Sequence, residues 1–550
     1  MNCKQCTTEF EITDSDRQFY KKMDVPEPTF CPDCRQQRRL SFRNERNLYR
    51  LKSSLSGKDM LSNYSPEKPY IVYHANEWWS DDWDPLDYGK DFDFSNSFFE
   101  QFKGLMAIVP RPNLFYYFSE NSEYTNHCYH NKDCYMLFNS AYCNDVYFSS
   151  NLMVHDTDCI DCMTTEKSEL LYECAFTKGC YRSNYLTHCN NCSDSSFLYD
   201  CKDCRDCFMC WNLRNKRYCY LNEELSKEDY FEKIKRHDLS DYSQVERLRY
   251  DFSDHFKKDV IHKQFQNLNS DNVTGDYIFN SKNVRDSFFA DKCEDIAHCY
   301  DALENKDCMD TYECSIDVER QYECYGCNES SEIMFCEICQ SSHNLQYCDY
   351  CFSCQECFGC IGLRNKKYCI FNKQYSKEDY LKLKLEIINH MKKGAEYGEF
   401  FPTTLSPYCY NESMAQEFYP LAEEEVKKKA WNWKDETVLA LNVKKTINAD
   451  KLPDRTQDIP DDVLNWALVC NESQRPFRLI LQELKFYRTA GLSLPHLHPD
   501  IRHKNRISIR NPRKIFDRKC DKCSSEMKTS YSPERPEQVY CEECYLKEVY

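Results

Sequence analysis

The hydrophobic and polar positions in the middle of the chain repeat with a period of about twelve residues, and cysteines mark the period. The clearest run spans 324–369, where Cys-x2-Cys pairs begin at 324, 336 and 348. This period is too short for helical repeats but matches one coil of a narrow β-solenoid. Because stacked coils repeat about every 4.8 Å, we predict that each cysteine lies on the cysteine of the next coil, with a change of spacing at 293–314.

Helical patterns interrupt and follow this region. Ser226 and Ser376 each stand three positions before an aspartate and open runs of Tyr, Leu, Ile and Lys, which is typical of helix N-caps. Gly394 fits the end of the second of these helices. Two further helices are expected at 421–431 and 460–470, the latter because it opens with a proline, which suits a first helical turn.

Two internal duplications organise the chain. A shift of 467 residues aligns 1–79 with 468–546 without a gap, and both copies keep the run Tyr-Ser-Pro-Glu. A shift of 150 residues aligns 121–230 with 271–380, and both copies keep Leu-Arg-Asn-Lys followed by a cysteine. Repeats of this kind constrain the architecture before any single element is assigned.

We therefore predict a mainly β fold with helical insertions, in which a duplicated β-solenoid-like, cysteine-rich core is flanked by duplicated zinc-ribbon modules. A chain of 550 residues is long enough for several domains. The expected segments are an N-terminal zinc-ribbon module at 1–79, an aromatic and acidic connector at 80–120, solenoid halves at 121–225 and 271–375, a helical insertion at 226–270, a helix-rich connector at 376–467 and a C-terminal zinc-ribbon module at 468–550.

Each terminal module keeps one complete set of four cysteines. The two sets are Cys3, Cys6, Cys31 and Cys34, and Cys520, Cys523, Cys541 and Cys544. Paired Cys-x2-Cys turns at this separation are typical of zinc ribbons, and four thiolates leave no open position for water or substrate. We predict two structural zinc ions. The aligned positions in the other half of each module, where no metal is expected, are Ser53, Ser56, His74 and Glu77, and Cys470, Ser473, His498 and Ile501.

The cysteines of the core allow two interpretations. Of the 38 cysteines, 28 fall in the two solenoid halves. Cysteine is small and weakly polar, so it suits the interior of a narrow coil, and packing is the favoured interpretation. Alternatively, neighbouring pairs could converge on additional zinc or on copper(I). The candidate set for such a site is Cys324, Cys327, Cys336 and Cys339.

Composition narrows the class of protein. The chain does not begin like a signal peptide, and no apolar run approaches the roughly 18 residues of a membrane helix. We therefore expect reduced thiols in a cytoplasmic protein without a membrane partner. Only 11 glycines are present, and no phosphate-binding or nucleophile-elbow motif occurs. No catalytic residue is predicted, and the sequence leans away from an enzyme.

Basic residues cluster in the terminal modules although the net charge is −18. That net charge argues against a protein that coats nucleic acid along its whole length, but a local patch can still bind phosphate. The candidate nucleic-acid contacts are Arg35, Arg39, Arg43, Arg46, Arg502, Arg506, Arg510 and Arg513. An equally weighted alternative is that these arginines bridge the halves of their module or pair with acidic residues elsewhere.

Three motifs carry a resemblance to a known group. They are Cys-Pro-Asp-Cys-Arg-Gln-Gln-Arg-Arg at 31–39, Val-Tyr-Cys-Glu-Glu-Cys-Tyr at 539–545 and Leu-Arg-Asn-Lys-x-Tyr-Cys in the core. Over most of its length the chain resembles the large uncharacterised cysteine-rich zinc-ribbon proteins of candidate-phyla (Patescibacteria-like) bacteria. The resemblance implies a bacterial cytoplasmic protein with zinc-ribbon ends, and it carries over no activity.

The leading hypothesis is a non-enzymatic zinc-binding scaffold that contacts RNA or a ribonucleoprotein through its Arg-rich modules, and protein partners fit the same role. The second hypothesis is metal or thiol buffering by the cysteine-rich core. The third is a β-solenoid enzyme that acts on polysaccharide, which rests on fold analogy alone.

Overall fold

The computed structural model describes residues 1–435 and 443–550, without the side chain of Leu152. Contacts divide the chain into two compact units, each built from segments that are distant in sequence. Unit 1 consists of Met1–Leu114, Phe265–Asp435 and Pro512–Ile515, and unit 2 of Phe115–Gln264, Glu436–Asn511 and Phe516–Tyr550. The N-terminal module therefore folds with the second solenoid half, and most of the C-terminal module folds with the first.

The prediction of a mainly β fold with a solenoid core is confirmed, with about 21 turns in the two halves together. The solenoid strands of unit 2 are β5 (Tyr116–Tyr117), β6 (Asn126–Tyr129), β7 (Phe138–Ala141), β8 (Asn144–Tyr147), β9 (Ser150–Val154), β10 (Thr157–Ile160), β11 (Met163–Glu166), β12 (Glu169–Tyr172), β13 (Ala175–Lys178), β14 (Tyr181–Thr187), β15 (Ser196–Tyr199), β16 (Arg205–Trp211), β17 (Arg217–Tyr220) and β18 (Glu223–Glu224). Those of unit 1 are β20 (Asp271–Phe279), β21 (Lys282–Asp291), β22 (Glu294–Ala297), β23 (Tyr300–Tyr312), β24 (Ser315–Tyr325), β25 (Ser331–Met334), β26 (His343–Gln346), β27 (Gln355–Phe358), β28 (Lys367–Ile370) and β29 (Lys373–Gln374).

The coils stack in parallel with the expected register. Leu186 pairs with Leu198, and Leu198 pairs with Cys210, each twelve residues on. Each half also contains one coil of thirteen residues instead of twelve, since Val146 pairs with Cys159 in unit 2 and Thr311 pairs with Cys324 in unit 1. In unit 1 the register shift falls between β23 and the start of β24, so the irregularity expected at 293–314 extends into the following coil.

The backbone turns sharply once every three residues in both solenoid halves. His188, Asn191 and Asp194, for example, all have positive φ angles. Asn, Asp and His accept this left-handed conformation more readily than other non-glycine residues, and a twelve-residue coil thus has four corners and four short sides. The residue after each corner belongs to the interior, as shown by the complete burial of Cys189 and Cys192. A Cys-x2-Cys pair in the core therefore lies on two successive sides of one coil.

Each solenoid half ends in the same way. Antiparallel pairs β17–β18 and β28–β29 close the last coils and lead into helices α5 (Lys227–Ile234) and α7 (Lys377–Lys393). Ser226 and Ser376 cap these helices through hydrogen bonds from the backbone N–H groups of Asp229 and Asp379, and Gly394 ends α7. The predicted helix ends are confirmed here.

The helix expected at 460–470 is wrong. The chain forms a short 3-10 turn at Asp461–Asn465 and then strand β31 (Trp466–Val469), which pairs with β30 (Lys445–Asn448) and β32 (Pro476–Phe477). Pairing on both sides of β31 outweighs the local helical signal. The helix expected at 421–431 is present as α9 (Glu423–Lys428).

The remaining elements build the modules and connectors. Those of unit 1 are α1 (Asp14–Lys22), α2 (Pro32–Leu40), β1 (Tyr49–Lys52), β2 (Asp59–Ser62), β3 (Val72–Tyr73), α3 (Ala75–Trp78), α4 (Phe98–Ile108), β4 (Arg111–Pro112) and α8 (Met414–Phe418). Those of unit 2 are α6 (Tyr242–Lys258), β19 (Ile261–Lys263), α10 (Leu481–Ala490), α11 (Pro499–Ile507), β33 (Phe516–Lys519), β34 (Glu526–Thr529), β35 (Gln538–Tyr540) and α12 (Glu542–Val549).

Candidate metal centres and arginine contacts

The first cysteine quartet gathers at the start of helix α2. Cys31 is the N-cap residue of α2 and Cys34 lies in its first turn, while Cys3 and Cys6 come from a turn near the N-terminus. The four sulfurs lie within 4.8 Å of one another, and those of Cys6 and Cys31 are 3.6 Å apart. A hydrogen bond with Cys34 lowers the pKa of the Cys31 thiol to about 7, although burial acts in the opposite direction. The lowered pKa favours the thiolate form of Cys31.

The second quartet has the same plan at the other end of the chain. Cys541 is the N-cap residue of α12 and Cys544 lies in its first turn, while Cys520 and Cys523 follow strand β33. The sulfurs of Cys523 and Cys541 are 3.8 Å apart, and the Cys541 N–H donates to the Cys520 sulfur at 3.3 Å. A hydrogen bond with Ser525 is the main cause that lowers the pKa of Cys523 to about 6.

Both quartets fit a structural zinc ion. Zinc–sulfur bonds of about 2.3 Å in a tetrahedron place sulfurs about 3.8 Å apart, which agrees with the two distances above. The helix N-termini beside Cys31 and Cys541 also favour negative charge on sulfur. In the described part of the chain, these two quartets are the groups of three or more possible ligands whose atoms come together.

The halves that lost their cysteines are held together by other bonds. In the first module Ser53 donates a hydrogen bond to Glu77, and the His74 ring accepts one from the backbone N–H of Asn76 at the start of α3. In the second module the backbone N–H of Ser473 donates to the buried Cys470 sulfur at 3.4 Å. Each degenerate half therefore keeps the turn-and-helix geometry of a zinc site.

The core cysteines make contacts typical of packing. Cys351 donates its thiol to the carbonyl oxygens of Asp349 and Cys360, each at 3.6 Å, and Cys192 does the same with the residues two before and nine after it. The same carbonyl oxygens already accept backbone N–H groups of neighbouring coils, so the thiols add only weak contacts to a backbone that is already paired. The set Cys324, Cys327, Cys336 and Cys339 lies in this interior but is not among the ligand groups found in the described residues.

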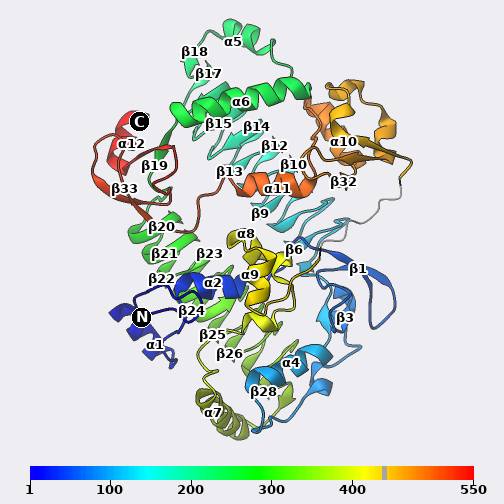
Figure 1. The fold of residues 1–550 in the computed structure, drawn as a ribbon, viewed down its shortest axis with the longest axis vertical. Helices are drawn as coiled ribbons and strands as arrows, with labels where there is room; N and C mark the ends of the chain where they lie inside the picture. Colours follow the sequence, from blue (N-terminus) through cyan, green and yellow to red (C-terminus); the bar gives the residue numbers. More distant parts are fainter. Residues whose placement is uncertain (436–442) are drawn as a thin grey trace. The chain divides into compact units, whose positions relative to one another are not determined.

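In unit 1, arginines of the N-terminal module are buried against the solenoid. Helix α2 packs on β23 and β24, as Figure 1 shows. Arg35 lies 2.8 Å from Asp310, Arg39 lies 2.8 Å from Glu323, and each of the four side chains is at most 2% exposed. Burial raises the pKa of Asp310, but Arg35 and Arg39 outweigh this effect and hold the pKa below its ordinary value.

The aligned arginines of unit 2 make the equivalent contact. Arg502 and Arg506 lie on α11, and both pair with the buried carboxylate of Asp161, in the case of Arg506 at 2.6 Å. Asp161 follows Cys159 by two positions, just as Asp310 follows Cys308. The duplication therefore preserved a salt bridge between a module and a solenoid half.

Most of the candidate nucleic-acid contacts are thus engaged inside the protein. Arg43 pairs with Glu313, and Arg513 lies beside Asp301 with a side chain that is 7% exposed. Arg46 and Arg510 are partly exposed and have interactions of their own. These contacts match the alternative interpretation, in which the arginines pair with acidic residues elsewhere in the chain.

Sequence reasoning missed the acidic partners of these arginines. Asp161 and Asp310 occupy corner positions with positive φ, where aspartate is common for conformational reasons alone. The sequence did contain a sign of these contacts, because both copies keep the aspartate in the solenoid half and the two arginines in the module. Glu323 is also kept, since the shift of 150 residues aligns it with Glu173, but in unit 2 that glutamate pairs with Arg249 of α6.

Comparisons with known proteins do not identify a family. No protein-family model matches the chain, and no curated protein matches it. Among solved structures, a "putative acetyltransferase from Desulfovibrio desulfuricans G20" shares 10% identity over 48% of this chain and 69% of its own, with a TM-score of 0.11. A likeness at that TM-score carries no argument about fold or function. Within the described residues, no helix has the length and apolar character needed to cross a bilayer.

Proposed function

We propose that the chain is a non-enzymatic scaffold in which two structural zinc ions fix the terminal modules in the shape that docks on the solenoid halves. One observation carries the proposal. Helix α2 begins after the zinc ligand Cys31, carries Cys34 in its first turn and holds the docking residues Arg35 and Arg39 further along the same helix. A zinc ion at the start of α2 would therefore set the position of both arginines.

The other zinc site stands beside a solenoid contact in the same manner. Tyr545 follows the ligand Cys544, and its hydroxyl donates a hydrogen bond to Asp200 of the solenoid. Arg214 donates to the same hydroxyl at 2.5 Å. Metal binding and docking are thus adjacent on α12, which supports a structural role for this ion as well.

Metal content and stability test the proposal. The purified chain should contain two zinc ions by elemental analysis and native mass spectrometry. Removing zinc with a chelator should release both modules, seen as hydrogen exchange in α2 and α12, while the solenoid halves stay protected. Cys34→Ser and Cys544→Ser should each leave one ion. A chain that is metal-free and exchanges no faster in α2 and α12 would overturn the proposal.

The same measurement bears on the other hypotheses. Well above two zinc or copper ions per chain would favour metal buffering by the core cysteines. RNA contact through the modules is supported by their arginine content alone, and it would require the buried arginines to leave their carboxylates. It predicts salt-dependent RNA binding that is lost in Arg46→Ala/Arg510→Ala, the two partly exposed candidates. Membership of the Patescibacteria-like zinc-ribbon group stays a proposal based on the shared motifs.

A further inference from the structure

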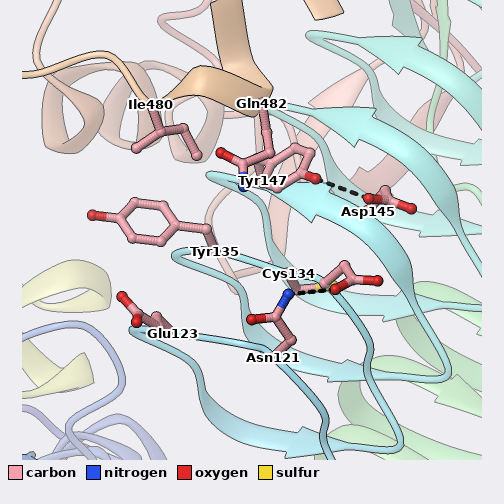
Figure 2. Close-up of a pocket in the computed structure, with 9 residues that line it drawn as sticks. Asn121, Glu123, Cys134, Tyr135, Asp145, Tyr147, Ile480 and Gln482 are labelled. Atoms are coloured by element: carbon pink, nitrogen blue, oxygen red, sulfur yellow. Dashed lines mark hydrogen bonds between the residues drawn. The ribbon is translucent and has the colours of Figure 1, made fainter. Parts of the chain in front are cut away.

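Unit 2 contains a cavity on the side of its solenoid, with a volume of about 380 Å³. Figure 2 shows the solenoid strands on one side of it and the start of α10 on the other. The lining residues are Asn121, Glu123, Asp133, Cys134, Tyr135, Asp145, Tyr147, Ile480 and Gln482. The volume lies in the range typical of small-molecule sites.

The lining is acidic. It includes three carboxylates and no basic residue. Asp145 accepts a hydrogen bond from the Tyr147 hydroxyl at 3.0 Å, and Asp133 accepts one from Asn121 at 2.5 Å. Within the described residues, none of the three carboxylates has a lysine, arginine or histidine within ion-pair distance. The negative charge of the cavity is therefore not neutralised by the chain itself.

The same row of carboxylates continues into the next coil. Asp158 stacks after Asp145, and its pKa is raised first by burial and then by the charges of Asp145 and Glu169. Arg478 lies near Tyr135 but outside the lining, and its guanidinium donates to the carbonyl oxygen of Leu464 at 2.9 Å. A row of carboxylates at this spacing would be stabilised by an added cation.

Two tyrosines add a second feature. Tyr135 and Tyr147 occupy the same column of neighbouring coils, and Figure 2 shows both rings at the cavity. Aromatic faces beside carboxylates bind organic cations well, because the ring quadrupole and the carboxylate charge both attract positive charge. A hydrated metal ion would make little use of the rings.

The duplicated unit provides its own cations at the matching place. Tyr135 aligns with Arg285, which pairs with Asp16 of the N-terminal module. Lys22, on the same module, pairs with Asp307, which stacks after Asp295 as Asp158 stacks after Asp145. In unit 2 the position of Lys22 is a threonine, so both built-in cations are replaced by uncharged side chains, while Asp145 and Asp158 keep the acidic positions of Asp295 and Asp307.

We propose that this cavity binds a small organic cation that carries a guanidinium or primary ammonium group. The charged group of the ligand lies between the carboxylates and the two tyrosine rings. The apolar part of the ligand contacts Ile480. This inference is independent of the zinc ions, since the cavity residues are not part of either quartet.

Calorimetry on the full-length, zinc-loaded protein tests the inference. Butylguanidine and butylamine should bind with one-to-one stoichiometry and weaken with added salt, while the uncharged isostere butylurea should bind at least about tenfold more weakly. Asp145→Asn should weaken butylguanidine binding by a similar factor. Tyr135→Arg should abolish binding, because it installs the guanidinium found in the other copy.

The duplication offers a matched control. Asp295→Asn changes the aspartate of unit 1 that aligns with Asp145, and it should leave butylguanidine affinity unchanged. Circular dichroism melts and zinc content establish that each variant is folded. The inference is wrong if neither cation gives saturable binding at roughly millimolar concentrations, if butylurea binds equally well, or if Tyr135→Arg binds butylguanidine like the parent protein.

Discussion

The hydroxyl of Ser53 donates a hydrogen bond to the carboxylate of Glu77, at the two positions that align with Cys520 and Cys544 of the second cysteine quartet. In both copies this turn joins the two strands of a hairpin, β1–β2 or β33–β34, and the helix that follows, α3 or α12, carries the other two positions of the quartet at its start. In the N-terminal module this turn and helix are thus joined by a hydrogen bond, whereas in the C-terminal module four cysteine sulfurs lie at the same positions.

Restoring the four cysteines should create a third metal site. The variant Ser53→Cys/Ser56→Cys/His74→Cys/Glu77→Cys has four ligands on a backbone that already follows the zinc-site geometry. Native mass spectrometry should then count three zinc ions instead of two. Ser53→Cys alone should stay at two, because one thiol cannot complete a tetrahedral set. A folded four-cysteine variant that still held two ions would show that the backbones differ.

Removing one buried guanidinium should cost far more stability than removing an exposed one. Arg39→Ala removes one partner from each of the fully buried Glu323 and Asp310, which keep Arg38 and Arg35. The loss should therefore lie below the roughly 3–5 kcal/mol of an uncompensated buried charge but above that of an exposed ion pair. Urea denaturation should report this loss for unit 1, and Arg506→Ala should do the same for unit 2. Arg17→Ala is the control, since Arg17 is 52% exposed in its ion pairs and should cost less than about 1 kcal/mol. Equal effects of Arg39→Ala and Arg17→Ala would contradict the docking role.

Asp156 should make unit 2 less stable as the pH rises. Burial raises the pKa of this carboxyl, in the solenoid interior, to about 7, although Thr165 and the backbone N–H of Ser168 donate hydrogen bonds to it. The unfolded carboxyl loses its proton near pH 4, so stability falls between about pH 4 and pH 7 as the folded state alone keeps the proton.

Asp156→Asn should reduce that slope, and a part remains because burial also raises the pKa of Glu483 in the same unit to about 7. Thermal melts from pH 4.5 to 8 should show a flatter profile and a higher melting temperature at pH 8 than the parent protein. Asp517→Asn, at an exposed side chain, serves as the control and should leave the slope unchanged. A parent protein whose stability rises over this range would contradict the assignment of Asp156.

Thiol reactivity should separate the terminal cysteines from those of the core. Cys6 and Cys523 are exposed, whereas Cys189 and Cys351 are completely buried. With zinc bound, iodoacetamide should modify neither class, and chelation should expose only the eight terminal sulfurs. Peptide mapping by mass spectrometry should find core cysteines alkylated only after denaturation. Core labelling as fast as that of Cys6 in chelated protein would contradict a packed interior.

The sequence predicted what depends on local spacing. The twelve-residue coil, the caps at Ser226 and Ser376 and the two cysteine quartets all follow from patterns within a few tens of residues. It did not reveal that Cys201 and Cys204 lie on successive sides of one coil, although cysteines continue at every third position through Cys210. That three-residue rhythm belongs to neither a helix nor an ordinary strand, so the usual templates overlook it.

The sequence did not predict which module docks on which solenoid half, and there is a physical reason for this. Each module could have docked on either solenoid half, because both halves carry the same aspartate at the docking position. Local spacing does not say which half a module meets, and the second carboxylate of each contact comes from a different element, Glu323 from β24 in unit 1 and Glu483 from α10 in unit 2. The strand at Trp466–Val469 was missed similarly, since its partners decide its conformation.

The interleaved composition of the units has a consequence for synthesis on the ribosome. Glu323 follows Arg39 by 284 residues, so at roughly 5–20 residues per second the arginines of α2 wait roughly 15 to 60 s for their carboxylates. The first quartet is complete long before then and can take up zinc during translation. An undocked N-terminal segment, with its guanidinium groups open to solvent, is therefore an obligatory stage in the life of each nascent chain.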